Sequence, residues 1–155
     1  MKKIAIVIFL SLFLVGCETQ EERENRIKKE NIDKLQEEYK DAQMSDTAKD
    51  WLVETKLENV VTILCLSSSK KCEEIKANYE TLKNDLKINI EFIELDNVSD
   101  SDKSVYKTTY KLNDYASYVP YIFITNKGIL TSTKTDIYKN EDLINYFKEN
   151  KIITE

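Results

Sequence analysis

The sequence predicts an α/β domain built on one mixed four-stranded sheet flanked by helices, with a charged helical segment in front of it. Three observations predict this fold class. A continuous apolar run at 60–66, β-branched at its start, is typical of a buried strand. Apolar residues recur every three or four positions at 75–86, which indicates one buried helix face. Two later apolar runs flank Asn126-Lys127-Gly128, which is typical of a turn between two paired strands.

Residues 1–16 are typical of a secretory signal. Two lysines precede a short apolar run, and this run falls below the ~20 residues that a bilayer-spanning helix needs. The run ends in Leu14-Val15-Gly16-Cys17, which resembles the lipobox of bacterial lipoproteins. The resemblance implies cleavage before Cys17 and acylation of this cysteine, which would anchor the protein on the extracytoplasmic face of the cell membrane. A plain cleaved signal or an N-terminal anchor, with Cys17 incidental, is the alternative.

Charge and composition exclude several function classes. The chain has 155 residues and a formal net charge of −5, which becomes −7 once Lys2 and Lys3 leave with the signal. Its basic residues form no patch beyond short lysine pairs, so nucleic acid is not an expected partner. The sequence has no histidine, which removes the commonest general base and metal ligand and excludes a Ser-His or Cys-His nucleophile. We therefore expect neither a metal nor a cofactor.

Residues 17–44 are highly charged and contain neither proline nor glycine. Their apolar side chains recur at roughly helical spacing: Ile27, Ile32, Leu35, Tyr39 and Ala42. We interpret the segment as a solvated helix that acts as a tether between the lipid anchor and the domain. A coiled-coil partner face is the alternative, although the stripe falls short of three clean heptads.

We place the domain at 45–155. Ser45 can cap its first helix, and Trp51 in that helix is expected to pack against the sheet. The strand and the helix described above follow. A second apolar run at 88–95 predicts another strand, and the intervening helix makes the two strands parallel with a right-handed crossover.

The second half of the domain continues this pattern. The polar stretch 96–102 predicts a turn and the stretch 105–112 a helix. Strands at 121–124 and 129–135 are expected to pair as an antiparallel hairpin, with glycine where the turn needs positive φ. Asn140 is expected to cap the last helix. The helices need both faces of the sheet, which predicts three layers.

Cys72 lies in the first turn of the helix that follows the first strand. Unpaired N–H groups and the helix dipole at this position favour a thiolate. Lys70 and Lys71 would lower the pKa of this thiol further, whereas Glu73 and Glu74 work against its ionisation. A reactive thiol is one interpretation. The other is a small apolar residue buried beneath the turn, with the two lysines merely solvated.

Pro120 is the only proline, and it stands immediately before a strand that reads as central. Because proline has no N–H for the ladder, it must begin the strand, lie at an edge or sit in a bulge. The series of strand, cysteine helix, strand, helix, Val119-Pro120, hairpin and final helix resembles the thioredoxin family over about 45–150. The resemblance implies a cis Val119–Pro120 bond and a position for Pro120 close to Cys72.

The chain departs from that family at the redox motif. The family carries Cys-x-x-Cys at the helix start, whereas this sequence has Ser69-Lys70-Lys71-Cys72. Disulfide exchange needs an attacking thiolate and a second thiol, and Ser69 replaces the attacking one. Cys65 is an available partner for Cys72, but a disulfide needs Cα atoms within about 7 Å and Cys65 would have to reach past the turn. We expect a buried, unpaired Cys65, with a Cys65–Cys72 bond as the alternative.

Tyrosines crowd the segment that leads to Pro120. In thioredoxin-like proteins the groove beside the cis-proline receives extended chains, so the resemblance implies partner binding here by strand addition. Tyr115 and Tyr118 are the candidate contact residues, because aromatic rings supply large contact areas. The alternative is that these rings pack with the core or are simply exposed.

Together these observations predict a membrane-anchored, extracytoplasmic thioredoxin-like lipoprotein that acts as a non-catalytic binding or accessory module with a protein partner. Its layout resembles the accessory proteins associated with bacteriocin transport in Gram-positive bacteria, which generally keep more of the cysteine motif. One alternative is a thiol–disulfide oxidoreductase that uses Cys72 alone or with Cys65. The other is an envelope structural protein in which the domain is only a scaffold.

Overall fold

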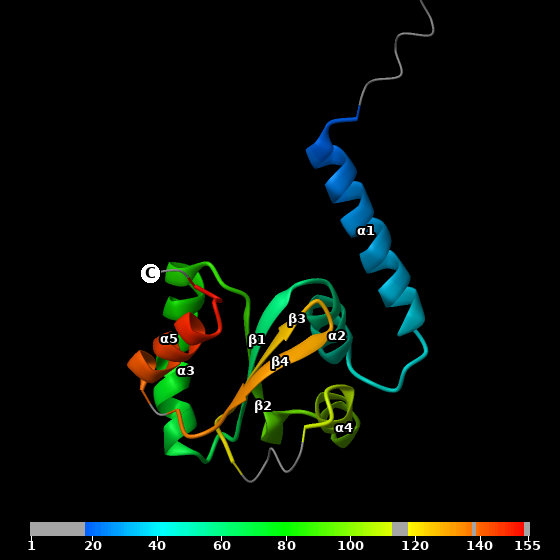
Figure 1. Cartoon of the computed structure of the whole chain (residues 1–155). Helices are drawn as coiled ribbons and strands as arrows, with labels where there is room; N and C mark the ends of the chain where they lie inside the picture. Colours follow the sequence, from blue (N-terminus) through cyan, green and yellow to red (C-terminus); the bar gives the residue numbers. More distant parts are fainter. Residues whose placement is uncertain (1–17, 113–117, 138, 154–155) are drawn as a thin grey trace, which may run out of the picture. The chain divides into compact units, whose positions relative to one another are not determined.

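The computed structural model describes residues 18–112, 118–137 and 139–153 (Figure 1). Leu35–Glu155 forms one compact unit, and the chain up to Lys34 forms another. Cys17 lies outside the described residues, so its lipidation stays a prediction. None of the helices in the described ranges combines the length and the hydropathy needed to cross a membrane.

Four strands form the mixed sheet that the sequence predicts. They are β1 (Asn59–Cys65), β2 (Ile90–Glu94), β3 (Tyr121–Asn126) and β4 (Ile129–Lys134), in the spatial order β2-β1-β3-β4. The β1–β2 pair is parallel, and the β1–β3 and β3–β4 pairs are antiparallel. The predicted parallel pairing of β1 with β2 and the predicted hairpin are both confirmed.

Helices cover both faces of this sheet. Those of the domain are α2 (Asp46–Leu57), α3 (Lys70–Leu86), η1 (Leu95–Asn97), α4 (Asp100–Thr109) and α5 (Asn140–Glu149). Figure 1 shows α3 and α5 on one face and α2 and α4 on the other. Because β1 lies inside the sheet between two helical layers, every one of its residues after Asn59 is buried, as its continuous apolar sequence predicts.

Alternation along β1 divides the core into two clusters. Val61, Ile63 and Cys65 pack in the cluster beneath α3 and α5, whereas Leu64 packs in the cluster beneath α2 and α4. Successive side chains of a strand point to opposite faces, which explains this division. Cys65 therefore faces the same side as the helix that follows it in the chain.

Trp51 anchors the second cluster, as predicted. Its side chain is buried and meets the ring of Tyr106 edge-on, with ring centroids 4.8 Å apart. The indole N–H donates to Thr62 Oγ1 at 3.0 Å, so the polar groups of both buried side chains are satisfied. This bond links α2 to β1.

The start of α2 is fixed by a buried carboxylate. The Ser45 side chain caps α2 by accepting from the amide of Ala48, and the amide of Ser45 donates to Asp102 Oδ1 at 2.9 Å. Asp102 lies in the first turn of α4, where its own amide donates to Ser99 Oγ. Burial alone would raise the pKa of Asp102, but hydrogen bonds from Ser45 and Ser99 outweigh it and hold the pKa below its usual value.

The helix α3 is attached to the edge strand β2 by side chains as well as by its buried face. Lys76 Nζ lies 2.7 Å from Glu94 Oε1, and the rings of Tyr79 and Phe92 stack with centroids 4.9 Å apart. These contacts hold the helix that carries Cys72 beside the sheet.

The β3–β4 hairpin closes through two residues with positive φ, 46° at Lys127 and 85° at Gly128. Glycine adopts such values without steric cost, as the sequence analysis expects. The amide of Gly128 donates to the Thr55 carbonyl at 2.8 Å, which fixes the hairpin to α2.

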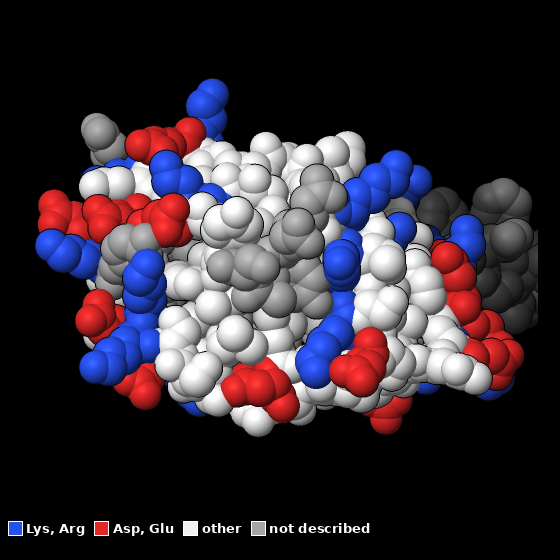
Figure 2. Space-filling view, turned by 90° about the horizontal axis from the view of Figure 1, so that it is seen from below, with Lys and Arg blue, Asp and Glu red and all other residues white. Residues whose placement is uncertain are grey.

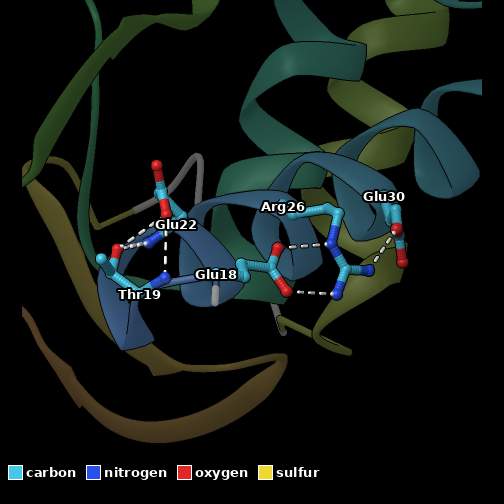
Figure 3. Close-up of polar contacts among 5 residues, drawn as sticks. All are labelled: Glu18, Thr19, Glu22, Arg26 and Glu30. Atoms are coloured by element: carbon cyan, nitrogen blue, oxygen red, sulfur yellow. Dashed lines mark hydrogen bonds and ion pairs between the residues drawn. The ribbon is translucent and has the colours of Figure 1, made fainter. Parts of the chain in front are cut away.

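The segment before the domain contains the helix α1 (Gln20–Glu38), none of whose described residues is buried. Its N-terminus has a capping box (Figure 3). The amide of Thr19 donates to Glu22 Oε2 at 2.8 Å, and the amide of Glu22 donates to Thr19 Oγ1 at 3.2 Å. The charged helix predicted within 17–44 is therefore present.

Ion pairs on the surface of α1 connect residues one and two turns apart. Arg26 Nε lies 2.8 Å from Glu18 Oε1, and Arg26 Nη1 lies 3.0 Å from Glu30 Oε1 (Figure 3). The hydrogen bond from Arg26 lowers the pKa of Glu18. Such pairs slightly stabilise a solvent-exposed helix.

Candidate functional site

The turn between β1 and α3 is held in place by serine side chains and backbone. The Ser67 amide donates to both carboxylate oxygens of Asp96, at 3.1 and 3.0 Å, and the Ser67 hydroxyl bonds the same carboxylate. Hydrogen bonds from the Ser67 side chain and backbone lower the pKa of Asp96. The Ser69 amide donates to the Leu66 carbonyl at 3.0 Å. The turn is thus tied to η1, which directly follows β2.

Ser69 is the N-cap of α3. Its side chain accepts from the amide of Cys72 at 3.4 Å, and its backbone is extended, as at most helix N-caps. The residue in the position of the family's attacking thiol therefore satisfies a helix amide. Lys70 and Lys71 are exposed at the start of the helix.

Cys65 and Cys72 form a disulfide, with Cα atoms 5.7 Å apart. The expectation of an unpaired Cys65 is therefore wrong. Cys65 ends β1 on the face that α3 covers, and the tight turn brings the first turn of α3 back over the end of the strand. The side chain of Cys65 does not have to reach past the turn, because Cys72 lies above it.

The disulfide is buried. Cys65 is 0% exposed and Cys72 is 2% exposed, and both belong to the core cluster beneath α3 and α5. Of the two interpretations of Cys72, the structure favours the buried one. As a disulfide sulfur, Cys72 carries no thiolate for the helix dipole or the lysines to stabilise.

The Val119–Pro120 peptide bond is cis, as the resemblance implies. In the sheet Leu64 pairs with Tyr121, so one step further along both strands brings Cys65 opposite Pro120. Val119 packs against the core cluster that contains Cys65 and Cys72. The disulfide, the Ser69 cap and the cis-proline therefore meet at one end of the sheet.

Tyr118 precedes this cis bond and is 60% exposed, whereas Tyr115 lies outside the described residues. Figure 2 shows the molecule from the end where β1 and β2 finish and α3 begins. Uncharged described atoms lie on both sides of a row of basic side chains that crosses this face, and most acidic side chains lie toward its margins. The described part of the face thus mixes uncharged and basic surface, and Tyr118 adds a large exposed ring at the cis-proline end of the sheet.

A hollow of about 350 Å³ lies at the opposite end of the sheet, where α2, α3 and α5 end. Its lining includes Lys87 and Lys151, whose positive charges suit the exposed carbonyls of helix C-termini. The described residues contain no group of three or more His, Cys, Asp or Glu that could hold a metal ion.

The sequence analysis gave the bond between the cysteines only as the alternative, and it did not predict the role of Asp96. The alternation of side chains along the strand could have indicated the cysteine bond. Cys65 follows Ile63 by two residues and so faces the same side, and the next helix packs on that side. Asp96 was assigned to a polar turn, and no local pattern in the sequence connects it with Ser67.

Comparisons with known proteins agree with this architecture. No family model and no curated protein matches the sequence. Among solved structures, thioredoxin f2 from Chlamydomonas reinhardtii is similar with a TM-score of 0.52 and 12% identity, over 68% of this chain and 90% of that one. The thioredoxin of Fasciola hepatica gives 0.50 and 12%, over 65% and 88%.

A mutant thioredoxin from Halobacterium salinarum gives a TM-score of 0.50 and 13% identity, over 68% of this chain and 85% of that one. The chain has a thioredoxin-like fold. At these identities the likeness establishes the fold alone. The activity must be argued from the site.

Proposed function

We propose that this protein is a lipid-anchored, extracytoplasmic thioredoxin-like module that binds a protein partner and performs no thiol–disulfide exchange. One observation carries the proposal: Cys72 is buried in a disulfide with Cys65, while Ser69 occupies the attacking position as a helix cap. An accessory role beside a transport system, which the layout resembles, is one form of such a function.

The chemistry of exchange supports the absence of catalysis. A thiol–disulfide oxidoreductase presents one sulfur to its substrate, forms a mixed disulfide there and releases it with a second thiol. A serine hydroxyl at position 69 forms no such bond. Neither Cys65 nor Cys72 is accessible to a protein substrate, because each is at most 2% exposed. The pair therefore acts as a structural cross-link.

The end of the sheet beside the cis-proline is the binding surface we propose. Tyr118 contributes an exposed aromatic ring there, and uncharged described atoms occupy part of this face. Aromatic rings at this end of the sheet suit an extended chain that pairs with the backbone beside the cis-proline. Tyr115 belongs to the same proposal on sequence grounds.

Anchoring through Cys17 is supported by the lipobox-like sequence and by the cross-link itself. Buried structural disulfides are typical of proteins outside the cytoplasm. A single acyl chain binds membranes only reversibly, so firm anchoring needs more than one chain on the N-terminal cysteine. We expect a Cys17→Ala variant to leave the membrane fraction, and its retention there would contradict the anchor.

One observation favours the alternative of a thiol–disulfide oxidoreductase: Cys65 and Cys72 form a disulfide that could be reduced and reoxidised. Reduction of insulin by dithiothreitol decides between the two. We expect the wild type to accelerate the reaction no more than a Cys72→Ser variant does, with an active thioredoxin as the positive control. Acceleration by the wild type that is lost in Cys72→Ser would overturn the proposal.

A further inference from the structure

We infer that this protein is a substrate of the dithiol-oxidising machinery of its compartment: a protein disulfide oxidises Cys65 and Cys72 while the domain is unfolded. The inference rests on the proposed structural role of the pair. It also reverses the role that the fold would suggest, because the chain receives a disulfide and does not transfer one.

Access to the sulfurs is the first argument. A thiolate and the sulfur that it attacks must come into contact during exchange. Cys65 is 0% exposed and Cys72 is 2% exposed, so an oxidant cannot reach either sulfur of the folded domain. The reaction must occur before the core closes or after it opens.

The attachment of the turn is the second argument. Ser67 is hydrogen-bonded to Asp96, and Ser69 caps the helix that carries Cys72. Ile75, one turn later in α3, is completely buried in the cluster that contains both cysteines. Exposure of Cys72 therefore requires the start of α3 to separate from the core, which is at least a sub-global opening of the domain.

The unfolded chain, by contrast, is well suited to the reaction. The cysteines are seven residues apart in sequence, so the loop between them is short and its closure is entropically cheap. One cysteine thiolate attacks the oxidant's disulfide and expels one oxidant thiolate. The second cysteine thiolate then attacks the mixed disulfide and expels the other. The cysteine pair loses two electrons and two protons, and the oxidant's two sulfurs gain them.

The test compares oxidation of the folded and the unfolded chain. Full-length protein carrying Cys17→Ser, so that only Cys65 and Cys72 react, is reduced in urea. Half is then refolded anaerobically in detergent, and circular dichroism establishes that it is folded. Oxidised glutathione is added to both halves as the probe disulfide, and the remaining thiols are counted by mass after alkylation.

We expect the folded chain to oxidise about 100-fold more slowly than the chain in urea, after correction for the effect of urea on a short dicysteine peptide. Equal corrected rates would overturn the inference. If the reduced chain does not refold, the rate at which a phosphine reduces the oxidised protein is measured instead. We expect this rate to rise with urea in proportion to the unfolded fraction. Reduction that is fast without urea would overturn the inference in that arm.

These outcomes are distinct from those of the insulin assay. Insulin reduction that depends on Cys72 refutes the structural role of the pair and with it this inference. A domain that is inactive on insulin but oxidises rapidly when folded refutes only the inference. Such a domain would be a binding module whose cross-link closes after folding.

Discussion

Asp102 shows how one residue can stabilise the domain only in its charged form. Asp102 is 3% exposed, and its carboxylate accepts a hydrogen bond from the Ser45 amide. The backbone amide of Asp102 donates to the Ser99 hydroxyl. Hydrogen bonds to a charged group contribute about 1.5–3 kcal/mol when they replace water. Because the pKa of Asp102 is lowered in the folded domain, folding stabilises the charged carboxylate relative to its protonated form.

We expect Asp102→Asn to lower the free energy of unfolding by about 1.5–3 kcal/mol at pH 7, because an amide replaces the carboxylate that accepts from Ser45. Since the pKa is lower in the folded state, the stabilisation is complete above the unfolded value of ~3.9 and is lost as the pH falls through the folded value. Urea unfolding followed by circular dichroism at pH 7 and near pH 3 measures this difference.

Asp100→Asn is the matched control for this prediction. Asp100 lies in the same first turn of α4, but its side chain is 98% exposed, so we expect a change of a few tenths of a kcal/mol. An Asp102→Asn effect that is equally large at pH 3 and pH 7 would show that lost packing, and not lost charge, is responsible.

At the scale of elements, the cross-link joins the end of β1 to the first turn of α3. A loop this short, with a sequence separation of seven, reduces the entropy of the unfolded chain enough to stabilise the fold by about 2–3 kcal/mol. The double variant Cys65→Ala/Cys72→Ala should therefore lose at least this amount, with a further contribution from the space vacated in the core.

Urea unfolding of the double variant and of the oxidised wild type measures this loss. Wild type unfolded in the presence of a phosphine reductant separates the cross-link from the packing of the sulfurs, because reduction breaks the bond but keeps both side chains. Equal stability of all three forms would show that the bond contributes nothing to the fold.

Most of the fold could be predicted from local sequence patterns. Most of the features that the sequence did not predict depend on tertiary contacts. The apolar run of β1, the periodicity of α3 and the glycine turn each specify an element from residues that are neighbours in the chain. The cysteine bond depends on how tightly residues 66–69 turn, and that is fixed by Asp96 from another strand end. The expectation for Cys65 was wrong because the sequence does not show how tightly this turn closes.

At the scale of the whole molecule, the proposed binding function depends on what the cis-proline end of the sheet contacts. Tyr118, 60% exposed, lies at this end, and Ile129, 68% exposed, lies at the hairpin. The two residues have similar exposure but belong to different surfaces, so they form a matched pair for a contact experiment.

We expect a photo-crosslinking amino acid at position 118 to capture a defined partner in intact cells, and the same group at position 129 to capture none. Binding by strand addition beside the cis-proline predicts this asymmetry. Gel mobility of the crosslinked product and mass spectrometry of the captured chain are the measurements. Equal capture at both positions, or none at either, would place the partner surface elsewhere and leave the scaffold alternative.

Trp51, finally, gives the domain an optical signal of its own. It is the only tryptophan in the sequence, it is 3% exposed, and three aromatic rings, those of Tyr106, Tyr110 and Phe123, lie within 6.4 Å of it. An indole that is shielded from water emits at shorter wavelengths than a hydrated one, and nearby tyrosines transfer excitation energy to it. Emission from this single ring therefore reports the integrity of the α2–β1 contact, without any added label.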